Sequence, residues 1–153
     1  MVRADVGSVR QESGETVLWL WGKGAEAADA FVVLTSATLG PLQEYLVARG
    51  PVRENEPLFG STSDGNRHQR MTTRSVRRIV KERLRGIQLD KPRLSAHSCR
   101  HTAVTLALLG GASIQETQQL ARHSDVNTTM MYAHNLKRAA GVPERAIDEL
   151  LSK

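Results

Sequence analysis

Four side chains in the second half of the chain have the types and the spacing to share one chemical task. His97 and Arg100 lie three residues apart, so a helix would present both on one face. His123 follows later, and Tyr132 comes nine residues after it. Arginine forks and imidazoles stabilise developing negative charge, and a phenol attacks only where nearby bases or cations favour the phenolate. The spacing therefore brings a cation and a titratable donor together on one helix face, and the second histidine and the tyrosine follow further along the chain.

Each of these residues also has a plainer explanation. A tyrosine on a short helix is more often a half-buried packing residue. His97 and His101 have the spacing of a metal-binding pair, but the glutamate of the zinc-protease motif is absent and no third ligand is evident, so we predict no metal. Cys99 points to a different helix face, and we expect it to pack in the core.

Positive charge is concentrated in one stretch of the chain. Lys and Arg number 21 against 16 Asp and Glu, which gives a net charge of +5. Residues 67–100 contain 11 basic and two acidic residues, a net of +9. Such clustering is typical of a surface that binds a polyanion, most often nucleic acid, and a solvated helix face is the alternative.

Composition also excludes several classes of protein. No apolar run approaches the roughly 18 residues of a membrane span, and the N-terminus lacks a hydrophobic signal region. The single cysteine cannot form an intrachain disulfide, which fits a reducing cytoplasm. We therefore expect one folded domain, no membrane contact and a cytoplasmic location.

The elements that must position these residues follow from local patterns. Apolar runs predict strands over residues 17–21 and 31–34 around a turn, and residues 6–10 could add a third strand. Helical spacing then begins near Thr35 and ends at Gly50-Pro51, with an apolar face formed by Leu39, Leu42, Leu46 and Val47.

The rest of the chain reads as helical. A helix from Thr72 or Thr73 should expose Arg74, Arg77, Arg78, Lys81 and Arg85 and bury Val76, Ile79, Val80, Leu84 and Ile87. Further helices are predicted over residues 97–109 after Ser95, from the capping box of Ser113 and Glu116, from Ser124 or Asp125 to about Tyr132, and from Pro143 onward. The predicted class is a mostly helical α+β domain with a small antiparallel sheet at the N-terminal end.

Three short segments resemble the active-site boxes of the tyrosine recombinase (phage integrase) family. They are His97-x-x-Arg100, Leu-Ala-Arg-His123-Ser and Thr-Thr-x-x-Tyr132-x-His134. The resemblance covers nearly the whole chain, and the opening residues and hairpin look most like integrases of conjugative transposons. It implies that residues 1–153 are a C-terminal catalytic domain that carries out site-specific DNA recombination and integration.

The resemblance also implies a mechanism without metal, cofactor or ATP. Tyr132 would form a 3′-phosphotyrosyl ester with DNA, and Arg100 would bind the nonbridging phosphate oxygens. His97 would transfer a proton near Tyr132, His123 would hydrogen-bond the scissile phosphate, and Lys23 would protonate the leaving 5′-oxygen. The expected DNA-contacting residues are Arg74, Arg77, Arg78, Lys81 and Arg122.

The same resemblance implies a partner and an assembly. The partner would be double-stranded DNA in the nucleoid of a bacterium, or DNA of a phage or mobile element. The assembly would be a homotetramer on DNA in which the C-terminal helix docks onto a neighbouring subunit, although this helix could equally pack on its own core.

One departure from the family pattern concerns activity. The first of the family's two catalytic arginines would fall upstream of Met1, together with the N-terminal DNA-clamping domain, and neither Arg3 nor Arg10 is a credible substitute. We therefore predict a truncated domain that is inactive or nearly so. A noncatalytic DNA-binding remnant or regulator, or a topoisomerase with the same tyrosine chemistry, remains an alternative.

Overall fold

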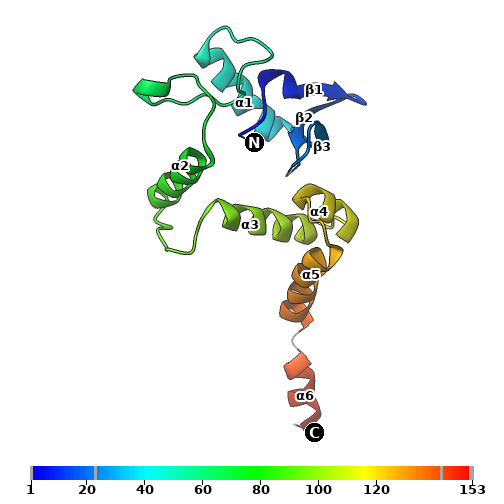
Figure 1. Cartoon of the computed structure of the whole chain (residues 1–153). Helices are drawn as coiled ribbons and strands as arrows, with labels where there is room; N and C mark the ends of the chain where they lie inside the picture. The colour runs from blue at the N-terminus through cyan, green and yellow to red at the C-terminus, as the bar shows by residue number, and fades with distance from the viewer. Residues whose placement is uncertain (1, 23, 142, 152–153) are drawn as a thin grey trace. The chain divides into compact units, whose positions relative to one another are not determined.

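The computed structural model describes residues 2–22, 24–141 and 143–151, and the chain divides into two compact units between residues 79 and 80 (Figure 1). The first unit holds η1 (Val6–Ser8), β1 (Val9–Glu12), β2 (Glu15–Trp21), β3 (Ala28–Val33), α1 (Ser36–Arg49) and η2 (Asp64–Asn66). Helix α2 (Thr73–Gly86) crosses the division. The second unit holds α3 (Ala96–Leu109), α4 (Ile114–Ala121), α5 (Val126–Gly141) and α6 (Pro143–Leu151). The predicted fold class is confirmed.

The sheet is antiparallel, with the strand order β1, β2, β3. Ser13 and Gly14 have φ of 51° and 86° and form the two-residue turn between β1 and β2, where positive φ matches the twist of the paired strands. The two predicted strands are present, and β3 begins at Ala28, earlier than expected. The third strand starts only at Val9, because residues 6–8 form the short 3-10 helix η1.

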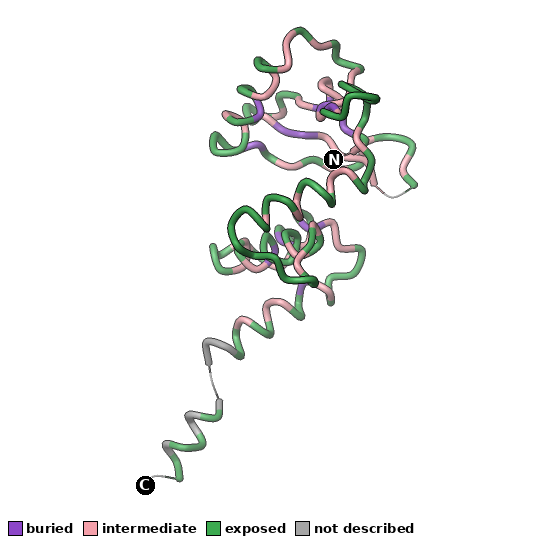
Figure 2. Tube along the Cα trace, turned by 90° about the vertical axis from the view of Figure 1, so that its left-hand side faces the viewer, coloured by how far each residue is buried: buried purple, intermediate pink, exposed green. Residues whose placement is uncertain are grey.

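The core of the first unit forms between the sheet, α1 and the chain that follows α1. Leu18, Leu42 and the fully enclosed Leu58 belong to it, and Figure 2 marks such buried positions in purple. Leu46 packs against this cluster, as predicted. Val47 was expected to be buried and is 82% exposed, because one residue of helix turns the side chain by about 100° away from the face of Leu46.

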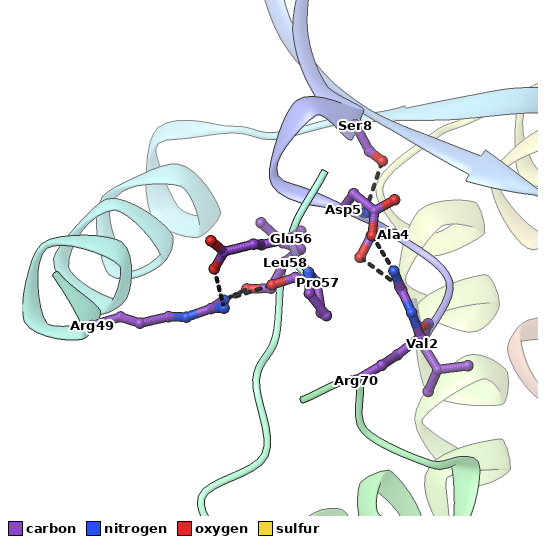
Figure 3. A network of polar contacts seen from close by, with 9 residues as sticks. All are labelled: Val2, Ala4, Asp5, Ser8, Arg49, Glu56, Pro57, Leu58 and Arg70. Atoms are coloured by element: carbon purple, nitrogen blue, oxygen red, sulfur yellow. Dashed lines mark hydrogen bonds and ion pairs between the residues drawn. The ribbon is translucent and has the colours of Figure 1, made fainter. Parts of the chain in front are cut away.

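Arg49, the last residue of α1, ties this helix to residues 56–58. Its side chain is only 3% exposed. The guanidinium donates to the carbonyl oxygen of Pro57 at 2.5 Å and pairs with the carboxylate of Glu56 at 3.3 Å (Figure 3). A buried arginine stays charged and needs such acceptors, so this cation has a structural role.

Arg70 has a similar role for the N-terminal segment. It donates to the carbonyl oxygens of Val2 at 3.1 Å and Ala4 at 3.3 Å, and it forms an ion pair with Asp5 (Figure 3). Asp5 also forms an isolated antiparallel bridge with Pro57. One charge of the basic stretch over residues 67–100 is therefore used to hold the fold together.

Helix α2 has the predicted start and a narrower apolar face than predicted. Val76, Val80 and Leu84 are half-buried along one side. Ile79 is 36% exposed and Ile87 is 65% exposed, which contradicts the expectation that both are buried. Ile79 lies at the edge of the apolar stripe, and Ile87 follows the end of the helix at Gly86.

In the second unit, helices α3, α4 and α5 contact one another. Val104 of α3, Thr117 of α4 and Thr129 of α5 are almost completely buried. The predicted caps are confirmed: the Ser95 hydroxyl accepts from the His97 amide, and the Ser113 hydroxyl accepts from the Glu116 amide, both at 3.2 Å.

Helix α5 is longer than predicted. It starts after Asp125, whose carboxylate accepts from the amide of Asn127 at 2.9 Å, and it continues past Tyr132 to Gly141. The residues after Tyr132 include alanine, leucine, lysine and arginine, which favour helix and supply no stop signal before Gly141. No described helix has both the length and the apolar composition needed to cross a bilayer.

Replacing Arg49 should destabilise the first unit. Arg49→Met keeps the length of the side chain but leaves the Pro57 carbonyl and the Glu56 carboxylate without their donor, so we expect a loss of about 2 to 3 kcal/mol in the free energy of unfolding. Trp19 and Trp21, the only two tryptophans, both lie on β2, so urea unfolding followed by tryptophan fluorescence reports on this unit.

Two further variants make this measurement specific. Arg70→Met removes an ion pair whose side chains are 41% and 31% exposed and should cost about 1 kcal/mol. Arg53→Met changes an exposed arginine in the segment between α1 and Glu56. Its free energy of unfolding should stay within about 0.5 kcal/mol of that of the original chain. Equal losses for Arg49→Met and Arg53→Met would contradict the structural role of Arg49.

Candidate active site

The cap of α3 fixes the position of His97 and Arg100. Ser95 and Ser98 form a reciprocal capping box, in which the Ser98 hydroxyl accepts from the Ser95 amide at 3.1 Å. The first turn of α3 is thereby set, and His97, Arg100 and His101 follow within it and the next turn. The prediction that these residues share a helix is confirmed.

Arg100 is anchored at the C-terminal end of α4. Its Nη2 donates to the carbonyl oxygen of Ala121 and lies 3.4 Å from that of Arg122. The last carbonyls of a helix carry partial negative charge, so a guanidinium is stabilised there. These contacts involve one terminal nitrogen of a group with five N–H donors, so the guanidinium retains donors for an anion.

His101 contacts the candidate nucleophile directly. Its Nδ1 lies in hydrogen-bond contact with the phenolic oxygen of Tyr132, and the centroids of the two rings are 5.5 Å apart. The ring of His97 packs edge-on against that of His101, with centroids 4.4 Å apart. The order on this face is therefore His97, His101, Tyr132.

His123 lies on the other side of the tyrosine ring. The two rings are nearly parallel, with an interplanar angle of 18° and centroids 6.3 Å apart. The Nδ1 of His123 lies 2.9 Å from the hydroxyl of Thr129, which is fully buried. Burial lowers the pKa of His123 below its ordinary value of 6.5, and the nearby charges of Arg100 and His101 lower it further. His123 is accordingly neutral at neutral pH.

The turn between α4 and α5 sets the place of His123. Arg122 adopts the left-handed conformation, with φ of 53°, and this ends α4. The amide of His123 then donates to the carbonyl of Gln118 at 3.1 Å, and the side-chain amide of Gln118 donates back to the carbonyl of His123 at 3.0 Å. Both the backbone amide and the backbone carbonyl of His123 are therefore hydrogen-bonded to Gln118.

The structure therefore brings four of the five predicted catalytic residues together in the second unit, on α3, on α5 and in the turn between α4 and α5. Arg100, His97, His123 and Tyr132 lie there, together with His101 and Thr129, which the sequence analysis did not place in the site. His101 was considered only as half of a metal pair. Its place directly after Arg100 and four residues after His97 was the available signal. Lys23 lies outside the described residues, so its role stays a prediction.

Cys99 is not a core residue. It is exposed, which contradicts the expectation of burial. The buried face of α3 is marked by Val104, and five residues of helix place Cys99 about 140° from it. Among the described residues, no group of three or more histidine, cysteine or acidic side chains could hold a metal ion.

The predicted DNA-contacting residues differ in how they are used. Arg74, Arg77 and Arg78 are exposed on α2. Lys81 is half-buried, pairs with Asp90 at 3.0 Å and donates to the carbonyl of Lys91 at 2.7 Å. The hydrogen bond from Lys81 lowers the pKa of Asp90, so this carboxylate stays ionised. Lys81 thus already has an anionic partner within the fold.

The chain as a whole is similar to known proteins. The model of the phage integrase family matches residues 2–139. Tyrosine recombinase XerC of Pelobacter propionicus is 36% identical over 131 residues, which cover 85% of this chain and 41% of that protein. XerC of Caldanaerobacter subterraneus is 33% identical over 123 residues, which cover 78% of this chain and 33% of that protein.

Solved structures of low identity share the fold. XerH recombinase in a post-cleavage complex with its palindromic difH substrate has a TM-score of 0.71 and 23% identity, covering 94% of this chain and 40% of that chain. XerA recombinase has a TM-score of 0.69 and 23% identity, covering 87% and 46%. The chain spans about two fifths of the length of XerC from Pelobacter propionicus. The match over residues 2–139 shows that the chain belongs to the phage integrase family, and the two XerC relatives named above are tyrosine recombinases.

Proposed function

We propose that this protein breaks and rejoins DNA strands in site-specific recombination, with Tyr132 as the nucleophile. The observation that carries the proposal is the grouping of Tyr132, His101, His123 and Arg100 within helices α3 to α5. A phenol, two imidazoles and a guanidinium are the groups needed to attack a phosphodiester and to stabilise the charge that gathers on it. Family membership supports the same reaction.

Each side chain then has a task that follows from its chemistry. Arg100 binds the nonbridging oxygens of the scissile phosphate. It uses the N–H donors of its guanidinium that do not contact the carbonyls at the end of α4. The Thr129 hydroxyl donates to Nδ1 of neutral His123, so Nε2 carries the proton and donates to the phosphate. His97 assists proton transfer next to Tyr132, and Lys23 protonates the leaving 5′-oxygen.

DNA contact and assembly form a second part of the proposal. Arg74, Arg77 and Arg78 on the exposed face of α2, with Lys81 and Arg122, contact the phosphate backbone of double-stranded DNA in the cytoplasm. Helix α6 docks onto a neighbouring copy in a tetramer on DNA. The exposed fractions of Ile147 and Leu150, 56% and 73%, support this use of α6 as a docking segment.

We further propose that the 153-residue chain alone binds DNA but cleaves it poorly. The family resemblance calls for a second arginine at the phosphate. Arg3 and Arg10 lie in hydrogen-bond contact with the backbone carbonyls of Ala25 and Gly7, so each already has an acceptor within the fold. Loss of one such donor typically lowers the rate by about 10² to 10³. Noncatalytic DNA binding is the second candidate function for the isolated chain.

Covalent capture of DNA tests the nucleophile. A pool of nicked duplexes with a randomised central segment is incubated with this chain, and with a chimera that places the N-terminal part of Pelobacter propionicus XerC ahead of it. We expect the chimera to form detergent-resistant protein–DNA adducts, and this chain to form about 10² to 10³ times fewer. Sequencing of the captured DNA then gives the preferred target.

Two tyrosine variants complete that test. Tyr132→Phe should abolish the adduct, because it removes the attacking oxygen. Tyr45→Phe, the matched control at the only other tyrosine, should leave the adduct unchanged. A chimera that traps no DNA, or one in which Tyr132→Phe still does, would contradict the proposed reaction.

Salt dependence tests the surface of α2. Replacing Arg74, Arg77 and Arg78 together by glutamine should weaken binding of a 30-base-pair duplex and reduce the slope of log affinity against log salt by about 0.9 for each lost phosphate contact. Fluorescence anisotropy measures both quantities. Arg53→Gln, in a different exposed segment, is the control. An unchanged slope in the triple variant would show that α2 does not contact the phosphates.

The direction of the pKa shift of His123 can be tested. Because burial and neighbouring positive charge lower its pKa, NMR titration of the ring should give a midpoint below 6.5. Arg100→Gln removes one of those charges and should move the midpoint upward, while Lys137→Gln should not. His123→Asn identifies the resonance. A wild-type midpoint at or above 6.5 would contradict the lowering of the His123 pKa by burial and neighbouring charge.

A further inference from the structure

We infer that His101 is a catalytic residue, the base that takes the phenolic proton of Tyr132 during attack and returns it on rejoining. This inference rests on the proposed function and changes one of its assignments. His101 Nδ1 lies in hydrogen-bond contact with the oxygen that would attack, and the His97 ring contacts His101. His97 is then a positioning residue that acts through His101.

The geometry favours His101 over the other imidazoles of the unit. The Nδ1 of His123 already faces the Thr129 hydroxyl at 2.9 Å, and the ring of His123 is stacked on that of Tyr132 with its centroid 6.3 Å away. A stacked ring presents its face to the phenol and not its nitrogen lone pair. His101 presents a ring nitrogen, so it is placed for proton transfer.

The site also leaves His101 accessible to solvent. His101 is exposed on α3, whereas its partner Tyr132 is half-buried on α5. The titratable groups that face it are His97 on its own helix, His123 after α4 and Tyr132 on α5. Arg100, the residue before it on α3, interacts with His123.

The step balances in both directions. The phenolic O–H of Tyr132 donates to Nδ1 of neutral His101. As the bond between the phenolic oxygen and phosphorus forms, the proton moves to Nδ1, and the bond between phosphorus and the 5′-oxygen breaks. The leaving 5′-oxygen takes a proton from a separate acid, proposed above as Lys23. When a 5′-hydroxyl of another strand attacks the ester, that acid is restored, and the imidazolium of His101 returns its proton to the phenolate.

Two substitutions separate proton transfer from simple positioning. His101→Asn places an amide oxygen near the position of Nδ1, so it retains a hydrogen-bond acceptor but cannot take up the proton. His101→Ala removes the hydrogen-bond acceptor as well as the group that takes up the proton. With the captured DNA as substrate, we expect both variants to slow adduct formation by about 10² to 10⁴, the range of general base catalysis. Cys99→Ala, an exposed change on the same helix, should stay within about twofold of the unchanged chimera.

The pH dependence of the rate of adduct formation distinguishes proton transfer from a purely structural role of His101. In the chimera, protonation of the proposed base should slow adduct formation at acid pH. In His101→Asn this acid limb should be lost, and the contribution of His123, whose pKa lies below its ordinary value, should remain. A rate that is reduced equally at every pH, or a full rate in His101→Asn, would overturn the inference while leaving Tyr132 as the nucleophile.

A measurement without DNA separates this inference from the proposed function. In the chain labelled with ¹⁵N-histidine, the Nδ1 of His101 should show the shift of an unprotonated, hydrogen-bonded nitrogen, and Tyr132→Phe should change it more than it changes the ring nitrogens of His134. His101→Asn assigns the signal. An unaltered His101 resonance in Tyr132→Phe would overturn the contact even if the chimera forms adducts. If the chimera forms no adducts, the proposed function is contradicted, whatever the spectrum of His101 shows.

Discussion

The contact between the Arg100 guanidinium and the last carbonyls of α4 determines the geometry of the rest of the site. A helix ends with carbonyl oxygens that have no intrahelical donor, and Arg100 supplies one from α3. That contact sets α3 against the turn from which His123 and α5 follow. The contact between His101 and Tyr132, across α3 and α5, depends on this arrangement. One cation thus connects the ends of two helices and faces the position proposed for the phosphate.

Arginines with the same formal charge serve different purposes in this protein. Arg49 and Arg70 satisfy carbonyl oxygens and carboxylates inside the first unit, and Arg100 does so at α4. Arg74 and Arg77 lie exposed on α2. Net charge therefore overstates the cations that are available to an external polyanion. Only the burial and the acceptors around each guanidinium distinguish the two groups.

Local patterns were sufficient to predict most of the secondary structure. The caps at Ser95 and Ser113 and the glycine after α1 depend on neighbouring residues, so the sequence contains them directly. Burial depends on partners far along the chain, and here the predictions were wrong for Val47, Ile79, Ile87 and Cys99. The boxes around Arg100, His123 and Tyr132 were found from their resemblance to the family pattern. Which imidazole touches the phenol depends on how α3 and α5 pack, so the contact of His101 with Tyr132 could not be predicted from the sequence.

The exposed arginines of α2 and the reactive side chains of α3 and α5 belong to different helices. Substitutions on the outward face of α2 can therefore accumulate without displacing the phenol or its imidazoles. Selection can therefore alter how strongly the protein holds the DNA backbone while the reactive groups stay as they are. Under the proposed function, this separation permits a lineage to adjust its affinity for DNA at little risk to turnover.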